Sequence, residues 1–302
     1  MCAPGWDDDA VFATLIGGRG VFALTPVGRF VWGGHYEQRS LIWRSRWVTT
    51  GGIVECRQAL AYPGDPHRAV LLRRVIAVAG DACVQIVFAP AAGFGRRGMK
   101  HVNRDDQGCW HAWIDGLRVR VQGIARASCE RDGSGIPALH TSLIVGEGSV
   151  RDIVAELSDA APAGLLPDAD VLWRQTETHW RDMVPAIGGG IAAGEADHCH
   201  AVLRGLTSAG GGMVAAATTS PPERAERSRN YDYRYLWIRD QCYPGQAIAV
   251  DAPRPLLDEA VGFVGQRLLA DGPDLKPAYT ISGAVAAVVA VAGLSRRDRH
   301  RR

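Results

Sequence analysis

The first half of the chain alternates apolar and polar residues in short runs, a pattern typical of β-strands. Between residues 11 and 150, runs rich in β-branched and aromatic side chains are separated by Gly, Pro and Asp. Strict alternation in Trp43-Arg44-Ser45-Arg46-Trp47 and in RVRV at 118–121 predicts strands with one buried and one solvated face. We therefore predict about ten strands in antiparallel sheets that form a sandwich.

Turn residues between these runs predict three hairpins. Asp-Gly is a strong signal for a tight primed turn, and the other two turns are also rich in Gly. The predicted pairs are 41–49 with 53–60 around Thr50-Gly51-Gly52, 110–114 with 117–121 around Asp115-Gly116, and 70–78 with 82–88 around Gly80-Asp81.

After residue 150 the apolar residues recur at helical spacing. Val150, Ile153, Val154 and Leu157 predict a helix in SVRDIVAEL. A break containing Pro and Ala follows at 160–170, and Asp168 can cap the next helix. Further helices are predicted at 171–180, 198–206, 236–250 and 256–269.

The composition indicates a globular chain whose partner is not a polyanion. The 302 residues are 47% hydrophobic and 22% charged, close to the average for soluble domains. Thirty-four Lys and Arg face 32 Asp and Glu, so the net charge is only +2. The longest apolar stretch, at 283–294, is shorter than the ~20 residues that span a bilayer. We expect neither nucleic acid nor a membrane as a partner.

The cysteines and the first residues predict a cytoplasmic protein. The seven cysteines are an odd number and contain no CxxC pair, which fits neither a disulfide framework nor a zinc ribbon. The chain starts MCAPGWDDDA, with three aspartates where a secretory signal has basic residues followed by an apolar run. Both features favour a reducing compartment.

Three polar or glycine-rich features are better explained by structure than by chemistry. Asp197-His198-Cys199-His200 has no second ligand cluster after it, so a helix start is favoured over a metal site. The glycine runs at 188–190 and 210–212 lack the Lys-Ser/Thr of a phosphate loop. The basic segment 295–302 lacks interleaved aromatic residues and is interpreted as solvated. We predict no metal and no cofactor.

Aromatic and charged side chains gather in the stretch 230–243. Stacking on aromatic rings suits the C–H faces of a sugar, while Arg donors and Asp acceptors suit its hydroxyls. The alternative is an amphipathic segment whose aromatics fill a core and whose Arg and Asp merely pair. Composition alone leaves both interpretations open. The aromatic residues concerned are Tyr231, Tyr233, Tyr235, Trp237 and Tyr243.

Two segments here resemble the start of the catalytic domain of glycoside hydrolase family 15, which includes glucoamylases, glucodextranases and some trehalases. They are GGMVAAATTSPPE at 211–223 and RNYDYRYLWIRD at 229–240. The family typically carries TGAIVAAPTTSLPE followed by RNWDYRYCWLRD, so length, order and spacing agree. The all-β half, TETHWRDMV at 176–184 and the helical remainder also fit, and the resemblance covers nearly all of residues 11 to 280.

The resemblance implies an α+β multidomain chain. Its parts are an antiparallel super-β-sandwich domain at 1–150, a helical linker at 151–194, and an incomplete (α/α)6 catalytic domain with an atypical basic tail at 195–302.

The resemblance also implies the subsite for the non-reducing glucose of an α-glucoside, either a maltooligosaccharide or a trehalose-like sugar. Arg239 and Asp240 would hold sugar hydroxyls, while Tyr233 and Trp237 would shape the pocket wall. These are substrate-binding residues.

The implied reaction is inverting hydrolysis by two carboxyl groups ~6.5–9.5 Å apart, one protonating the leaving oxygen and one activating water. The family draws both catalytic glutamates from later barrel helices, one in a motif like IWE-x-R, which this sequence lacks. We therefore assign no catalytic residue. The sequence VAAVVAVAGLSRRDRHRR at 285–302 is typical of a GC-rich gene read out of frame, so we expect a truncated or frameshifted chain.

A competing hypothesis is a non-catalytic carbohydrate-binding or structural β-sandwich module. Saturable sugar binding without turnover would favour it, whereas release of glucose would favour the enzyme. The sequence makes no prediction of oligomeric state.

Overall fold

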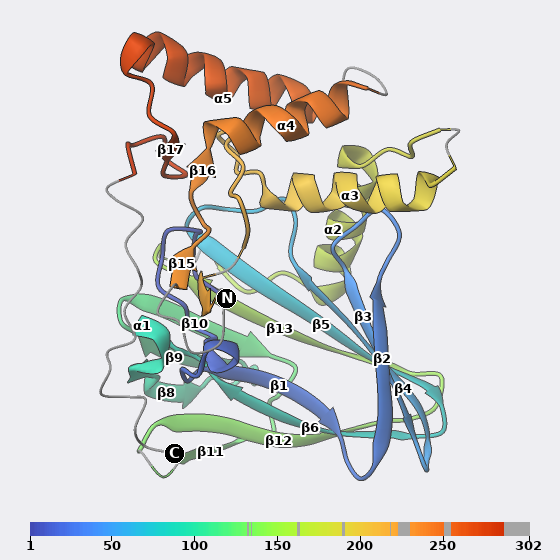
Figure 1. The fold of residues 1–302 in the computed structure, drawn as a ribbon. Helices are drawn as coiled ribbons and strands as arrows, with labels where there is room; N and C mark the ends of the chain where they lie inside the picture. Colours follow the sequence, from blue (N-terminus) through green and yellow to red (C-terminus); the bar gives the residue numbers. More distant parts are fainter. Residues whose placement is uncertain are drawn as a thin grey trace. The chain divides into compact units, whose positions relative to one another are not determined.

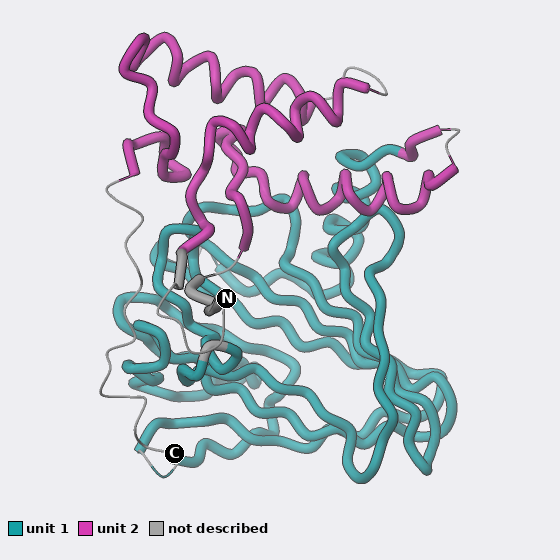
Figure 2. The backbone as a smooth tube through the Cα atoms, viewed as in Figure 1, with its two compact units in different colours: residues 1–185 teal, residues 186–302 magenta. Residues whose placement is uncertain are grey.

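The structure is a computed structural model that describes residues 1–131, 133, 135–161, 164–188, 191–217, 219–222, 230–250 and 255–286. The chain divides into two compact units, Met1–Pro185 and Ala186–Arg302 (Figure 2). The predicted domain limits 1–150, 151–194 and 195–302 stay a prediction. The tail 295–302 and most of the low-complexity sequence before it lie outside the described residues.

The first unit is built from two antiparallel sheets (Figure 1). One has eight strands in the order β2-β3-β4-β5-β13-β10-β9-β8, and the other has four in the order β1-β6-β12-β11. The strands are β1 (Val21–Pro26), β2 (Phe30–Tyr36), β3 (Trp43–Thr49), β4 (Gly52–Leu60), β5 (Arg68–Ala79), β6 (Ala82–Ala89), β7 (Arg97–Gly98), β8 (Lys100–Arg104), β9 (Trp110–Ile114), β10 (Leu117–Gln122), β11 (Ser128–Arg131), β12 (Pro137–Val145) and β13 (Val150–Ser158). The helical pieces are a 3-10 turn (Thr14–Ile16), α1 (Ala92–Gly95) and α2 (Ala169–Met183).

The core of this unit lies between the two sheets. Along β6 buried residues alternate with less buried ones, so one face of the strand is turned inward. Ile86 and Phe88 from the four-stranded sheet join Val75 and Ile153 from the eight-stranded sheet in one buried cluster. The predicted all-β sandwich is confirmed in its antiparallel sheets, which contain twelve strands among the described residues rather than about ten.

Two of the three predicted hairpins are confirmed. β3 pairs with β4, and β9 pairs with β10 through Asp115-Gly116, where both residues have positive φ, as a type I′ turn requires. The third prediction is wrong, because β5 and β6 lie in different sheets. Gly80 packs so tightly against the β3–β4 turn that an added Cβ would lie 2.2 Å from the Gly51 carbonyl oxygen. The chain crosses between the sheets at this corner.

The helix predicted in SVRDIVAEL is also wrong. This segment is β13, which pairs with β5 on one side and β10 on the other. Both of its faces are buried: Ile153 and Leu157 point into the core, while Glu156 on the other face is buried in an ion pair with Arg120. A strand buried on both faces lacks the two-residue alternation that marks a half-exposed strand. The spacing of the apolar residues in this segment therefore resembled that of a helix.

Helix α2 covers part of the eight-stranded sheet. Asp168 caps it, as predicted, by accepting hydrogen bonds from the backbone N–H groups of Asp170 and Val171. Trp173 is buried and its indole N–H donates to Asp152 of β13 at 3.0 Å. Helix α2 therefore belongs to the first unit.

The second unit is mainly helical. It contains α3 (Ala193–Leu206), α4 (Ile238–Ala249), α5 (Pro255–Asp271), a 3-10 turn (Gly272–Asp274) and two small antiparallel sheets, β14 (Thr219–Pro222) with β15 (Asn230–Asp232) and β16 (Leu236–Trp237) with β17 (Ala278–Tyr279). Figure 1 shows α4 and α5 side by side. The predicted helices at 198–206, 236–250 and 256–269 are confirmed, whereas the (α/α)6 barrel stays a prediction. Within the described parts of the chain, no helix is both long enough and apolar enough to cross a bilayer.

Candidate carbohydrate-binding site

The start of α4 is held in place by the small sheet before it. Leu236 pairs with Tyr279 in the β16–β17 ladder, and both side chains are fully buried. The backbone N–H of Ile238 donates to the Pro277 carbonyl at 3.1 Å. Burial, together with a hydrogen bond to Asp271, raises the pKa of Tyr279. The first turn of α4 therefore projects from a rigid base.

A buried glutamine that directly follows the second family-like segment ties α4 to the first segment. Gln241 of α4 is 2% exposed; its side-chain N–H donates to the Gly211 carbonyl at 2.9 Å, and its side-chain oxygen accepts from the Met213 backbone N–H at 2.8 Å. Gly211 has φ of +81°, and an added Cβ would lie 2.5 Å from the Glu259 carbonyl oxygen, so only glycine fits there. The glycine run predicted as a connector is therefore packed into the unit and tied to α4.

At the start of α4, Arg239 contacts two of the other predicted site residues, Asp240 and Trp237. The Arg239 Nη2 lies 2.9 Å from the Asp240 Oδ1, and the Arg239 Nε donates to the same oxygen at 3.0 Å. The guanidinium carbon lies 6.0 Å from the centre of the Trp237 ring, the outer range of a cation–π contact. Asp240 also lies in the first turn of α4, where the helix dipole favours a negative charge.

The accessibility of this group suits a binding surface. The Arg239 side chain is 70% exposed and that of Asp240 is 33% exposed, while Trp237 is half-buried. Arg239 offers five N–H donors and Asp240 four acceptor positions, more than their mutual contact uses. The pair can therefore present both donors and acceptors to a ligand.

Tyr233 is positioned through its backbone. Its carbonyl accepts from the Ala216 N–H at 3.0 Å, and the residue is 38% exposed. Next to it, the Arg234 Nη2 lies 2.7 Å from Asp232 Oδ2, and both side chains are largely buried. The arrangement therefore contains Arg–Asp pairs, as the amphipathic alternative expects, as well as exposed aromatic and charged groups. The sugar-binding roles of Tyr233, Trp237, Arg239 and Asp240 stay a prediction.

The sequence Asp197-His198-Cys199-His200 lies in a helix, and its aspartate has a structural role. It lies inside α3, which begins earlier, at Ala193, so the helix start predicted at these residues is wrong. Buried Asp197 accepts a hydrogen bond from the Ile187 backbone N–H at 2.8 Å and ties the preceding loop to the helix.

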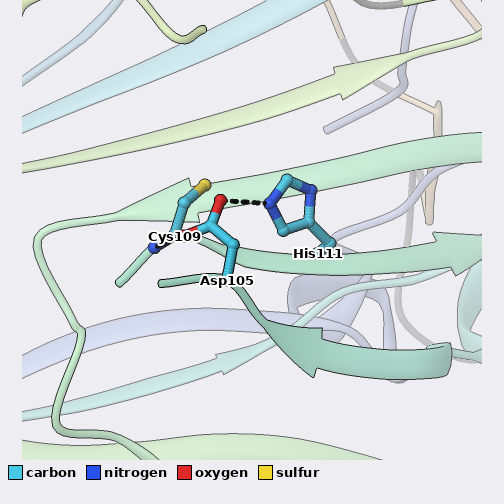
Figure 3. Close-up of side chains that lie close together, drawn as sticks. All are labelled: Asp105, Cys109 and His111. Atoms are coloured by element: carbon cyan, nitrogen blue, oxygen red, sulfur yellow. Dashed lines mark hydrogen bonds and ion pairs between the residues drawn. The ribbon is translucent and has the colours of Figure 1, made fainter. Parts of the chain in front are cut away.

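The described residues contain one group of side chains that could hold a metal, and the sequence analysis missed it. The ligand atoms of Asp105, Cys109 and His111 all lie within 4.8 Å of one another, and the three side chains gather at the start of β9 (Figure 3). The hydrogen bond with His111 lowers the pKa of Asp105, and burial raises that of Cys109. The sequence signal that could have found this group is Cys-x-His directly after an Asp- and Gly-containing turn.

Two family models match the chain in the order expected for this architecture. "Trehalase-like, N-terminal" matches residues 1–125, within the sandwich unit, and "Glycosyl hydrolases family 15" matches residues 201–292, which include the start of α4.

Several curated relatives are trehalases. The chain is 29% identical to a trehalase of Mycobacterium tuberculosis over 285 residues, covering 80% of this chain and 39% of that protein. It is also 29% identical to a trehalase of Mycolicibacterium smegmatis over 286 residues, covering 80% and 40%. A trehalase of Thermoplasma acidophilum is 56% identical over 54 residues, covering 18% and 9%. The chain therefore spans about two fifths of the length of the first two relatives.

Among solved structures, the chain is similar to a putative kojibiose phosphorylase from the human microbiome. The TM-score is 0.47 and the sequence identity 8%, over 87% of this chain and 41% of that one. The two family matches, together with relatives that extend across both units, show that this chain is similar to glycoside hydrolase family 15 proteins and to the trehalase-like N-terminal region.

Proposed function

We propose that this chain belongs to a trehalase-type glycoside hydrolase and that the first turn of α4 binds the non-reducing glucose of an α-glucoside. The observation that supports this most is the group of Trp237, Arg239 and Asp240, which lies in contact and partly exposed inside the family-15 match. The substrate is trehalose-like or a maltooligosaccharide, and the reaction of the family member is inverting hydrolysis. A cytoplasmic location and an (α/α)6 barrel belong to the same proposal.

The chemistry of these residues suits recognition rather than bond cleavage. Arg239 donates hydrogen bonds to sugar hydroxyl oxygens, and Asp240 accepts them from hydroxyl hydrogens. Trp237 supplies an apolar ring against which a sugar C–H face packs. Because Asp240 accepts hydrogen bonds from permanently charged Arg239, it is suited to holding hydroxyls and not to protonating a leaving oxygen.

These 302 residues supply groups that suit sugar binding but not the groups that hydrolysis needs. Inversion requires an acid and a base placed across the scissile bond, and each typically contributes ~10²–10⁴-fold to the rate. The sequence contains no IWE-x-R motif to supply one of them. The chain should therefore bind an α-glucoside without hydrolysing it at enzymatic rates.

Isothermal titration with trehalose and with maltose tests the binding site. Asp240→Asn should weaken binding by roughly 10- to 150-fold, because hydrogen bonds to a charged group contribute about 1.5–3 kcal/mol. Asp258→Asn is the matched control, since Asp258 is exposed in the first turn of α5, and it should bind like the unchanged chain. Equal affinity in both variants, or no saturable binding by the unchanged chain, contradicts the proposed site.

A glucose-release assay on the same samples tests the second part. We expect no release above the level of Asp240→Asn. Release of glucose by the unchanged chain that is lost in Asp240→Asn would mean that a carboxylate present in this chain serves as a catalytic group.

One observation supports the competing module hypothesis. Trp113 is 41% exposed on the sandwich unit and helps to form a shallow hollow, which suits stacking on a sugar ring. If Trp113→Ala abolishes sugar binding while Asp240→Asn retains it, the sandwich is the carbohydrate-binding part. The hollow is lined by Lys100, His101, Trp113, Asp115 and Gly116.

A further inference from the structure

We propose that Asp105, Cys109 and His111 form a binding site for a divalent transition metal of the zinc class in the sandwich unit. The oxygen, sulfur and nitrogen ligand atoms of these side chains all lie within 4.8 Å of one another, and Figure 3 shows the side chains directed toward one another. The site lies on the β8–β9 hairpin, far along the sequence from the proposed glucose-binding residues, and neither depends on the other.

The hairpin brings the three residues together from a short piece of sequence. Cys109 comes directly before β9 and His111 is the second residue of that strand. Their side chains lie close together, as Figure 3 shows. Asp105 opens the turn: its N–H donates to the Cys109 carbonyl at 2.9 Å, and its carbonyl accepts from Gly108 at 3.0 Å. Gly108 has φ of +82°, which lets the chain turn back at this point. Seven residues therefore supply all three ligands.

The carboxylate is fixed by the turn itself. Asp105 Oδ1 accepts hydrogen bonds from the backbone N–H groups of Gln107 at 3.0 Å and Cys109 at 2.9 Å. Its other oxygen, Oδ2, lies 2.8 Å from His111 Nε2. One oxygen thus anchors the ligand and the other is directed into the group, which is the kind of support that orients a metal ligand.

The distances suit a tetrahedral ion after small adjustments. Zinc binds sulfur at about 2.3 Å and nitrogen or oxygen at about 2.0–2.2 Å, which places tetrahedral ligands ~3.3–3.7 Å apart. The Asp105–His111 contact at 2.8 Å would open slightly, and the more distant pairs would close from at most 4.8 Å. Side-chain rotations supply shifts of this size without moving the ladder.

The donor set selects among metals. One thiolate, one imidazole and one carboxylate match zinc and similar borderline ions, whereas calcium and magnesium prefer oxygen ligands throughout. The thiolate and the carboxylate balance the two positive charges of the ion. Binding releases the Cys109 thiol proton to solvent and leaves the proton of neutral His111 on Nδ1, because Nε2 becomes the ligand. Water completes the fourth position, since Asp105 and His111 are both more than one third exposed.

The nearby cations are engaged with other groups. Buried Arg120 lies 2.7 Å from Glu156 and also donates to the Gly164 carbonyl at 2.6 Å. Arg104 donates to the Ala125 carbonyl, and its guanidinium lies 5.8 Å from the Trp110 ring centre. Their positive charges therefore already have partners.

The test measures Zn²⁺ and Co²⁺ binding to the full chain after removal of any affinity tag. We expect one high-affinity ion per chain, a Co²⁺ spectrum with a sulfur-to-metal charge-transfer band, and protection of Cys109 from alkylation, detected by mass spectrometry. Cys109→Ser and His111→Gln should each weaken Zn²⁺ binding by at least ~10–100-fold, the loss expected even for groups that only support ligands. Cys129→Ser is the matched control, because Cys129 is an exposed thiol of the same unit.

The alkylation readout uses the unchanged protein, so it decides the question even if a variant fails to fold. Zn²⁺ that leaves Cys109 as reactive as before, or that protects only other cysteines, overturns the proposal. So does a folded Cys109→Ser that binds Zn²⁺ and Co²⁺ like Cys129→Ser. In that case the Asp105–His111 contact serves the turn alone.

Discussion

Replacing Gln241 by Met should release the first family-like segment from α4. Methionine has a similar length and volume, so the change removes two hydrogen bonds without opening a large cavity. The Met213 N–H and the Gly211 carbonyl, both on buried residues, lose their side-chain partner. Any change in the stability of this segment can therefore be attributed to the loss of the two Gln241 hydrogen bonds.

The size of the effect follows from burial. Each backbone group left without a partner costs about 1–3 kcal/mol, while the more apolar side chain returns on the order of 1 kcal/mol. We expect Gln241→Met to lower the local free energy of opening by about 1–5 kcal/mol, which corresponds to roughly 5- to 4,000-fold faster hydrogen exchange.

Hydrogen exchange followed by mass spectrometry measures the local free energy of opening in peptides that contain Met213. Gln246→Met is the matched control: Gln246 lies on the same helix but is exposed, so its exchange should match that of the unchanged chain. Exchange at Met213 that is accelerated less than about threefold in Gln241→Met would refute the reasoning. It would mean that packing against Glu259, and not the glutamine, holds this segment.

Two further predictions concern titratable groups of the sandwich unit. Burial raises the pKa of Cys56 to about 12 from 9.0. Cys56 should therefore resist thiol reagents in the folded chain, while exposed Cys129 reacts. The stability that the neutral Cys56 thiol contributes should be lost as the pH rises above about 9 toward 12. Burial alone would raise the pKa of Glu37, but hydrogen bonds and charges from Arg57 and Arg44 outweigh it and lower the pKa below 4.5. The contribution of Glu37 to stability should therefore be present above pH 4.5 and be lost as the pH falls through its folded pKa, and urea unfolding of Glu37→Gln should depend less on pH in that range.

The sequence predicted local structure well where a short signal decides it. Asp115-Gly116 specifies its hairpin because the turn needs two residues at positive φ, and Asp168 specifies the start of α2 through its own side chain. Gly80-Asp81 carries a similar signal, yet its strands join different sheets. The difference lies in tertiary packing against the β3–β4 turn, which the local sequence does not encode.

The misassigned strand β13 shows a second limit of local patterns. Its outer face is polar in composition but buried in fact, because Glu156 is neutralised by Arg120 from the neighbouring strand. An interpretation based on hydrophobic periodicity counts Glu156 as a solvent-exposed position. The pairing of β13 with β10 brings Arg120, 36 residues away, to one carboxylate oxygen, and the pairing with β5 brings Arg68 to the other. These contacts between strands make the buried charge tolerable.

The two candidate sites differ in how much the sequence could reveal. The start of α4 was found through a motif, and the contacts of Arg239 with Asp240 and Trp237 come from neighbouring positions on one turn. The Asp105 group was missed because its spacing resembles no standard zinc motif. It depends on a hairpin whose turn places the Asp105 carboxylate beside the Cys109 thiol, directly before β9, and the His111 imidazole within β9.

The segment RNYDYRYLWIRD contains two Arg–Asp pairs with different physical roles. Asp232 and Arg234 are 10% and 13% exposed, and the Asp232 carboxylate also accepts the Arg234 backbone N–H at 2.9 Å, so this pair shapes the chain. Arg239 is 70% exposed, and a solvated pair of this kind contributes only about 0–1 kcal/mol to stability. Replacing Asp240 should therefore leave the fold intact and change only what the surface binds, whereas replacing Asp232 would leave a largely buried arginine without its carboxylate. The amphipathic interpretation accounts for the first pair, and the sugar-binding interpretation rests on the second.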